Sequence, residues 1–266
     1  LETNAFSITF WVNFNGTHGT SSVYVKIPKF ILYEKKIDFL SPITKADETL
    51  ANDEYRSLNY LSSHWDQSFG VGCVKPLGFI KEYNAIITER IQGDFFFERY
   101  RQSDLSNRYK EKEHDPVVLG MFNFGKSLRA FHSQTEVISK FKAEEVFSKL
   151  NLYINFLKNC DISYQYFDNL LHTISKYKDF ECSALIVNNF KGIDVRQIFI
   201  NQDNALLIID PGKISRGYSE VDLARFIVTC RILYWGTFAI FFKTSPNRSY
   251  EEMFLSGYYD SNRPPT

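Results

Sequence analysis

The sequence predicts an α+β protein, with an antiparallel sheet and one helix in its first part and mainly helices in its second part. The first observation is the alternation of apolar and polar residues at 7–14 and 22–27, which indicates two strands. The second is the helical spacing of apolar residues at 47–63, and the third is a series of helical patterns that begins at residue 116. This change of pattern predicts two domains, residues 1–93 and residues 94–266, with Gly93 at the boundary.

Length and charge limit the possible functions. The chain has 266 residues, of which 44% are hydrophobic, so it can build a large core. Lys and Arg together number 31, and so do Asp and Glu. No overall field therefore draws the chain to nucleic acid or to an acidic membrane, and we expect no nucleic-acid partner. The aromatic content of 17% is interpreted as a Phe-rich core rather than a stacking surface.

Cysteine use and hydropathy bear on the compartment. The four cysteines are widely scattered and form no Cys-x-x-Cys motif, which argues against a zinc ribbon or a disulfide scaffold. The longest apolar run, at 232–242, has 11 residues and is too short to span a bilayer. No signal peptide is visible. We expect a cytoplasmic protein without a transmembrane segment, and the sequence leaves its oligomeric state open.

The first two predicted strands are joined by residues 15–21. Asn15-Gly16 between strands is a strong hairpin signal. The spacing of Gly16 and Gly19 also fits a loop that cradles phosphate, which is a second interpretation. On the second strand Lys26 shares a face with Tyr24 and is either a surface lysine or a site residue.

The helix at 47–63 places Glu54 on the same face as its leucines, and Glu54 is either a solvated carboxylate or a site residue. A second hairpin is predicted at 74–79 and 85–90. Further helices are predicted from Pro116 to His132, at 142–160, at 164–178 and at 221–242, followed by a polar end at 247–266. His132 is interpreted as a packed or capping residue.

Oxygen-bearing side chains gather around a third predicted hairpin, formed by residues 197–200 and 205–209. Asp194 and Gln197 lie at or just before the start of the first strand, and Asp210 follows the second. These ends lie side by side in a hairpin, so the three side chains converge in a way that suits a hard cation such as Mg²⁺. The alternative is that Asp210-Pro211-Gly212 is an ordinary turn and Asp194 a solvated loop residue.

This hairpin resembles the catalytic and metal-binding loops of the kinase-like phosphotransferases, the superfamily of protein kinases, aminoglycoside and choline kinases and lipopolysaccharide-core kinases. The resemblance implies that Gln197 and Asp210 bind the metal, and that Asp222 is the buried helix residue that ties down the catalytic loop. A capping box at Ser219 is another explanation for Asp222. The usual His-Gly-Asp is absent, and the family's catalytic Asp falls on Gly192.

The resemblance extends to the first part of the chain. Val23-Tyr24-Val25-Lys26 is similar to the kinase strand whose lysine binds the α- and β-phosphates. It implies that Glu54 pairs with Lys26, with Asp53 as the other candidate. Backbone groups at Glu89, Arg90 and Ile91 would then bind the adenine edge at a hinge, and the phosphate loop would precede the first hairpin, around residues 1–6.

The implied function is ATP- and Mg²⁺-dependent transfer of a phosphoryl group to a hydroxyl of a small molecule or saccharide, in a two-lobed protein-kinase-like fold. Asp194 is the candidate general base, because it is the nearest carboxylate to Gln197. No Ala-Pro-Glu segment follows Asp210, which disfavours a protein kinase. A second hypothesis is a pseudokinase that binds a nucleotide or a partner, as the missing His-Gly-Asp suggests. A third is an unrelated α+β protein, which would follow if Lys26 and Asp210 lay far apart.

Overall fold

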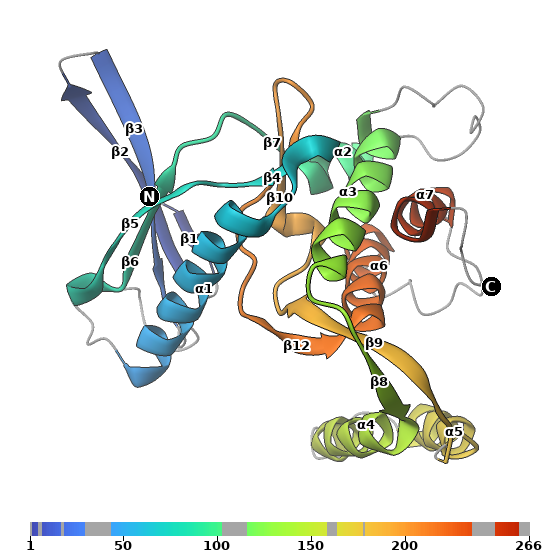
Figure 1. The fold of residues 1–266 in the computed structure, drawn as a ribbon. Coiled ribbons are helices and arrows are strands. Elements are labelled where there is room, and N and C mark those ends of the chain that lie inside the picture. The colour runs from blue at the N-terminus through green and yellow to red at the C-terminus, as the bar shows by residue number, and fades with distance from the viewer. Residues whose placement is uncertain are drawn as a thin grey trace. The chain divides into compact units, whose positions relative to one another are not determined.

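The computed structural model describes residues 2–4, 7–16, 19–29, 44–102, 116–158, 164–177, 179–235 and 248–260 (Figure 1). The chain has the predicted α+β class. It forms two compact units, one of Leu1–Thr135 with Asn188–Thr266 and the other of Glu136–Val187. These units do not correspond to the predicted domains, residues 1–93 and 94–266, and the division into lobes at Gly93 stays a prediction.

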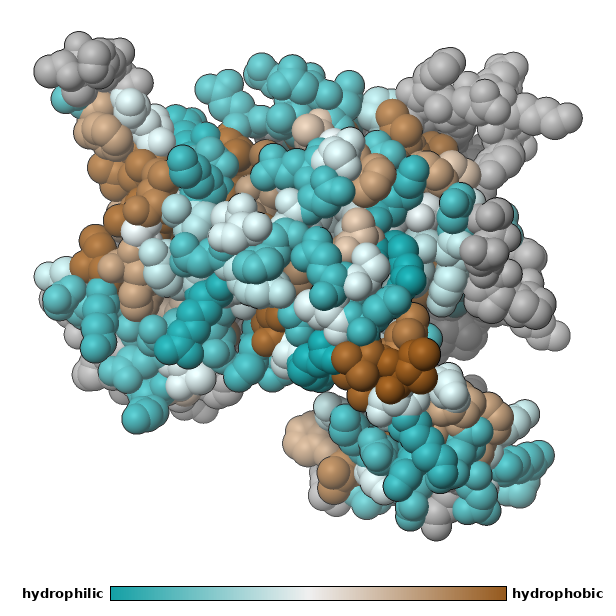
Figure 2. Space-filling view, in the orientation of Figure 1, coloured by the Kyte–Doolittle hydropathy of each residue, from teal (hydrophilic) through white to brown (hydrophobic). Residues whose placement is uncertain are grey.

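The first unit contains a five-stranded antiparallel sheet. Its order is β1 (Glu2–Asn4), β2 (Ser7–Gly16), β3 (Gly19–Pro28), β6 (Ala85–Glu89) and β5 (Pro76–Ile80). Gly16 pairs with Gly19, so both predicted hairpins of this region are present. The turn at 17–18 and residues 1, 5 and 6, where the phosphate loop was expected, lie outside the described residues. Figure 2 shows apolar side chains gathered over the hairpin of β2 and β3.

Helix α1 (Lys45–His64) lies against this sheet, as Figure 1 shows. It begins with a capping box, in which Thr44 Oγ1 accepts from Asp47 N at 3.2 Å and the Asp47 carboxylate accepts from Thr44 N at 2.9 Å. Leu58 then packs with Val74 and Ile86 in a small buried cluster. This cluster fixes the helix on the face of the sheet that carries Lys26, because Ile86 pairs with Lys26 in the sheet.

A second sheet has the order β4 (Val71–Cys73), β11 (Leu206–Ile208), β10 (Ile198–Asn201) and β7 (Gly93–Phe95). Strands β10 and β11 form the predicted hairpin, with Ile198 opposite Ile208. Its core side chains alternate, since Ile198 and Ile200 are buried while Phe199 is less so. The described 3₁₀ turns are η1 (Gln67–Phe69), η2 (Lys81–Tyr83) and η4 (Val195–Gln197).

The rest of the first unit contains four described helices and one strand. The helices are α2 (Phe96–Gln102), α3 (Pro116–Ser133), α6 (Ser219–Trp235) and α7 (Arg248–Tyr259), and the strand is β12 (Ile214–Tyr218). Helices α3 and α7 touch along their backbones, because a Cβ on Gly125 would lie 2.1 Å from the carbonyl oxygen of Phe254. The rings of Phe124, Phe226 and Phe254 pack against one another in the core, in agreement with a Phe-rich core. Among the described helices, none is both long and apolar enough to cross a membrane.

One sequence expectation was wrong in this region. The end of the chain at 247–266 was expected to be polar, but residues 248–259 form helix α7, with Tyr250 and Phe254 in the core. Tyr250, Phe254 and Tyr258 recur every four residues, so the helical spacing of the buried side chains is present in the sequence. The segment that begins at Tyr100 was expected to be a solvated connection or a helix end. Tyr100 lies near the end of α2, and its side chain is buried against Tyr250.

The second unit pairs β8 (Val137–Lys142) with β9 (Glu181–Phe190) in an antiparallel ladder. Helices α4 (Ala143–Lys158) and α5 (Tyr164–Ser175) lie between them in the sequence and match the two predicted helices. The two strands were not predicted. Strand β8 carries three polar residues in six and lacks a strong alternation.

Candidate active site

Three segments that are distant in the sequence meet at the ammonium group of Lys26. Lys26 Nζ, on β3, donates to Glu54 Oε1 on α1 at 2.8 Å and to Asp210 Oδ2, just after β11, at 2.6 Å. The predicted pair of Lys26 with Glu54 is therefore present, and Asp53 instead pairs with Lys213 at 3.1 Å. An unrelated α+β protein would be indicated if Lys26 and Asp210 lay far apart, but the two side chains are in direct contact.

The cluster is largely shielded from water. The exposed fractions of the Lys26, Glu54 and Asp210 side chains are 18%, 4% and 27%. Burial by itself lowers the pKa of Lys26, but the charges and hydrogen bonds of Asp210 and Glu54 outweigh it and hold the pKa above its ordinary value. Burial and the charge of Asp210 raise the pKa of Glu54 to about 7, against the opposing effect of Lys26. One ammonium between two carboxylates leaves an excess of negative charge, which favours a further cation.

Asp210 belongs to a tight turn that also fixes Gln197. The backbone N–H of Ile209 donates to the carbonyl oxygen of Gln197 at 2.9 Å, so Gln197 and Asp210 occupy neighbouring positions at one end of the hairpin. Gly212 adopts a φ of 60°, which favours glycine, and its N–H donates to Asp210 Oδ1 at 3.3 Å. The backbones of Gln197 and Asp210 therefore lie close together, as the sequence predicts.

The residues of the Lys26 cluster suit a Mg²⁺ site in which the protein supplies only some of the ligands. Within the described chain no group of three or more His, Cys, Asp and Glu side chains is arranged to hold a metal ion alone. Mg²⁺ is often bound by one or two carboxylates together with phosphates and water. The Asp210 carboxylate, its neighbour Gln197 and the excess negative charge fit such a site, in which most ligands come from the substrate.

Gly192 lies at the position that the resemblance gives to the catalytic Asp, and it is packed against the Asp210 turn. Its N–H donates to the carbonyl oxygen of Pro211 at 3.1 Å. A Cβ at Gly192 would lie 2.9 Å from the carbonyl oxygen of Asp210 and 3.0 Å from the nitrogen of Gly212. Any side chain here requires the turn to move, so this loop cannot present an Asp in the family's usual place.

Asp194 caps the η4 turn and is engaged by Arg196. Its carboxylate accepts from Arg196 N at 2.8 Å, from Arg196 Nε at 3.1 Å and from Arg196 Nη2 at 2.6 Å. The residue is 8% exposed, and it lines a small cavity with Gly192, Gln197 and Pro211. Among the hydrogen bonds and ion pairs of the described residues, none joins Asp194 to Lys26 or Asp210. Its role as a general base stays a prediction.

The three hinge candidates are Glu89, the last residue of β6, and the two residues that follow it, Arg90 and Ile91. Glu89 Oε1 accepts from Lys75 N at 2.8 Å, and the Arg90 guanidinium lies 5.5 Å from the centre of the Trp11 ring. Ile91 packs on the small cluster formed by Leu58, Val74 and Ile86, as does Ile209. In the part of the chain that the structure describes, the backbone groups of Arg90 and Ile91 make no backbone hydrogen bond. They are free to pair with the edge of a ligand, and that role also stays a prediction.

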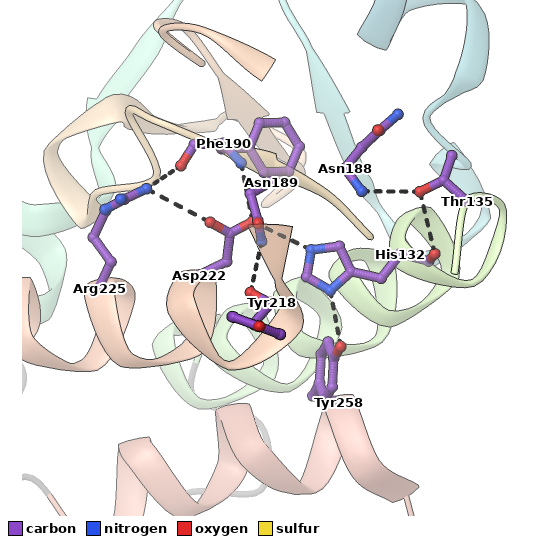
Figure 3. A network of polar contacts seen from close by, with 9 residues as sticks. All are labelled: His132, Thr135, Asn188, Asn189, Phe190, Tyr218, Asp222, Arg225 and Tyr258. Carbon is purple, nitrogen blue, oxygen red and sulfur yellow. Dashed lines mark hydrogen bonds and ion pairs between the residues drawn. The ribbon is translucent and has the colours of Figure 1, made fainter. Parts of the chain in front are cut away.

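Asp222 anchors Phe190, which lies two residues before Gly192 in the sequence (Figure 3). The residue is fully buried, and its Oδ2 accepts from the N–H of Phe190 at 3.0 Å and contacts His132 Nε2 at 3.2 Å. Arg225 Nη1 donates to the carbonyl oxygen of Phe190. The backbone N–H and the carbonyl oxygen of Phe190 are therefore both bonded to side chains of helix α6. These tertiary contacts are what the resemblance implies for Asp222. His132 Nδ1 contacts Tyr258 Oη at 2.8 Å, in keeping with a packed histidine.

Sequence reasoning did not find Arg196 or Arg225. Both belong to a residue type that is mostly exposed, and neither stands in a motif. For Arg196 the one available signal is its position two residues after Asp194, where a tight turn brings the two side chains together. For Arg225 it is the spacing of three residues from Asp222 on a helix.

No protein-family model matches the sequence, and no curated protein matches it significantly. Among solved structures the fold is similar to the gentamicin complex of APH(2″)-IIa, with 14% identity over 98% of this chain and 75% of that chain and a TM-score of 0.53. It is also similar to macrolide 2′-phosphotransferase MphH from Brachybacterium faecium, with 11% identity over 96% and 78% and a TM-score of 0.54. A third is glucosamine kinase in complex with glucosamine, ADP and inorganic phosphate, with 10% identity over 95% and 71% and a TM-score of 0.52. The chain therefore has the kinase-like phosphotransferase fold, as the resemblance in the sequence predicts.

Proposed function

We propose that the protein transfers the γ-phosphoryl group of ATP to a hydroxyl of a small molecule or saccharide, in a Mg²⁺-dependent reaction. The observation that carries this proposal is the position of Lys26, whose ammonium is held by Glu54 and Asp210 in one largely buried cluster. The sequence resemblance assigns these three residues to the phosphate and metal sites. Their contact supports that assignment.

The proposed roles follow from the charges. Lys26 would bind the α- and β-phosphates, and Glu54 would hold Lys26 in place. Asp210 and Gln197 would hold Mg²⁺, which when bound supplies charge neutralisation at the transferring phosphoryl group. Positioning and electrostatic stabilisation account for most of the catalysis in phosphoryl transfer, so few residues are needed.

The nucleotide would lie between the hinge and the Lys26 cluster. Arg90 and Ile91 have backbone groups available for an adenine edge, and Ile91 shares an apolar cluster with Ile209, the residue before Asp210. An apolar surface between a hinge and a charged site suits a ligand with a flat base and a phosphate tail. The similar structures include complexes with ATP and with ADP, which supports this choice of nucleotide.

The acceptor is proposed as a class only. The similar proteins are named for gentamicin, a macrolide and glucosamine, all of which carry hydroxyl groups. A cytoplasmic location is proposed with it, because ATP is abundant there and the described cysteines Cys73, Cys182 and Cys230 are free.

A second candidate function is a pseudokinase that binds a nucleotide without turnover. Two observations favour it. The position of the usual catalytic Asp is Gly192, which has no room for a side chain, and the nearby Asp194 is engaged by Arg196.

Thermal unfolding with ATP, with and without Mg²⁺, tests the proposal. A ligand at about 100 times its Kd stabilises the folded state by about 2.7 kcal/mol, so Mg²⁺-ATP should raise the Tm measurably. Phosphate transfer to a panel of sugars, amino sugars and amino alcohols then separates the two functions. Binding with transfer supports the kinase, and binding without transfer supports the nucleotide-binding pseudokinase. Absence of binding contradicts both and leaves a pseudokinase that binds a partner.

A further inference from the structure

Ser57 occupies the face of α1 that carries Glu54, one turn further along the helix. Its side chain is buried, with 4% of the residue exposed. The hydroxyl donates to the carbonyl oxygen of Asp53 at 2.8 Å and accepts from the N–H of Ile214 at 3.1 Å. Because the Ser57 hydroxyl hydrogen is donated to Asp53 within the helix, the hydroxyl oxygen uses a lone pair to accept from the N–H of Ile214.

Ile214 is the first residue of β12 and follows the Asp210 turn by a few residues. A second contact joins the same two segments, because Lys213 Nζ lies 3.1 Å from Asp53 Oδ2. Helix α1 is thus attached to the segment after Asp210 on both sides of Glu54. The Lys213 side chain is 47% exposed, so water and salt screen its ion pair with Asp53. The buried hydrogen bond of Ser57 therefore contributes more to holding α1 against this segment.

We propose that Ser57 is a positioning residue, which fixes α1 against the segment after Asp210 and thereby keeps Glu54 and Asp210 together around Lys26. Without the hydroxyl, the Ile214 N–H loses its partner and α1 can move relative to the Asp210 turn. Glu54 and Asp210 then no longer have a fixed separation. Lys26 can stay with only one of them.

The reactivity of Lys26 reports this arrangement without any nucleotide. Glu54 Oε1 at 2.8 Å and Asp210 Oδ2 at 2.6 Å enclose the Lys26 amine, whose side chain is 18% exposed, so an acylating reagent reaches it only when this arrangement opens. When one carboxylate moves away, the open arrangement is populated more often and the amine is accessible on that side. The rate at which Lys26 is acetylated rises with it.

Competitive labelling of the full chain with acetic anhydride, read by mass spectrometry of the peptide that contains Lys26, tests the proposal. Ser57→Ala should raise the labelling rate about threefold to tenfold, the factor expected for the loss of one hydrogen bond. Ser57→Thr, which retains the hydroxyl, should stay near the wild-type rate. The matched control is Ser63→Ala, because the exposed Ser63 makes the same kind of bond within α1, to Asn59 O at 3.1 Å, and its hydroxyl makes no other hydrogen bond among the described residues.

Equal labelling of Lys26 in Ser57→Ala and Ser63→Ala overturns the proposal. Should Ser57→Ala fail to fold, Ser57→Cys keeps the volume but weakens the acceptor, and a wild-type rate in that variant overturns it equally.

The consequence for Mg²⁺-ATP affinity rests on the proposed function, and a separate titration measures it. Ser57→Ala should weaken Mg²⁺-ATP binding by a factor similar to the change in labelling. If the wild-type chain binds no nucleotide, the proposed function fails while the labelling result still decides the role of Ser57.

Discussion

The carboxylate of Asp210 lies 2.6 Å from the ammonium of Lys26, although 184 residues separate them in the sequence. The contact joins the first sheet to the turn that follows β11. It places the ammonium of Lys26, which is largely shielded from water, beside a position suited to a divalent cation. The function of the protein depends on what this pair binds.

Lys26→Met should weaken ATP binding by at least about tenfold, since a hydrogen bond to a charged group contributes about 1.5 to 3 kcal/mol. The fold should remain, because Met fills similar space and Glu54 can take up a proton when its partner is removed. Isothermal titration with ATP and circular dichroism measure the two effects. Lys81→Met, a change at an exposed lysine on the η2 turn, is the control. Unchanged ATP affinity in Lys26→Met would mean that the alignment of β3 with the kinase lysine strand is wrong.

Asp210→Asn should remove the Mg²⁺ dependence of ATP binding, because a neutral amide is a poor ligand for a hard cation. The measurement is the Kd for ATP at a series of Mg²⁺ concentrations. Asp203→Asn makes the same chemical change at an exposed position of the turn between β10 and β11, and it should retain the dependence. An unchanged titration in Asp210→Asn reduces Asp210-Pro211-Gly212 to a structural turn.

Glu54 should make the stability of the protein depend on pH. Its pKa in the folded state is about 7, above its ordinary value of 4.5, so the folded state retains this proton more firmly than the unfolded state. The contribution to the free energy of unfolding is therefore fully present below about pH 4.5 and is lost as pH rises to about 7. It amounts to at most about 3 kcal/mol. Urea unfolding at pH 5, 6 and 8 should show this decrease in the wild type and a smaller one in Glu54→Gln, and equal slopes in both would contradict it.

Gly192→Ala should destabilise the Asp210 turn. Its Cβ would lie within 3.0 Å of three backbone atoms, which forces the turn to shift. Core overpacking typically costs about 1 to 3 kcal/mol. Gly70→Ala is a useful comparison, because its Cβ meets nothing within 4 Å and any cost there comes only from its φ of 69°. A Gly192→Ala protein as stable as the wild type would show that the loop adjusts easily and has room for a catalytic side chain.

The sequence predicted the order of the elements well because the signals there are local. The alternation around Lys26, the Asn15-Gly16 turn and the leucine spacing around Glu54 are each decided within about ten residues. The Lys26–Glu54 pair could be expected only through the resemblance, since no local pattern links β3 to α1. The clamp of Arg196 on Asp194 and the bond of Ser57 to Ile214 were missed. They depend on turn geometry and tertiary packing, which periodicity does not contain.

Asp194, the proposed general base, also caps the η4 turn, and the two roles respond differently to substitution. Asp194 accepts from Arg196 N as the N-cap of η4, and Asn is an equally good N-cap residue. Asp194→Asn should therefore change the Tm little, while it removes a carboxylate that could accept a proton. General-base help contributes about 10² to 10⁴ in rate, so kcat should fall at least about a hundredfold with ATP affinity retained. Arg196→Gln, which leaves the carboxylate and removes its ion pair, is the matched variant and should retain a pH-dependent rate. If Asp194→Asn turns over at the wild-type rate, Asp194 is a capping residue of η4 and the proton must go to another group.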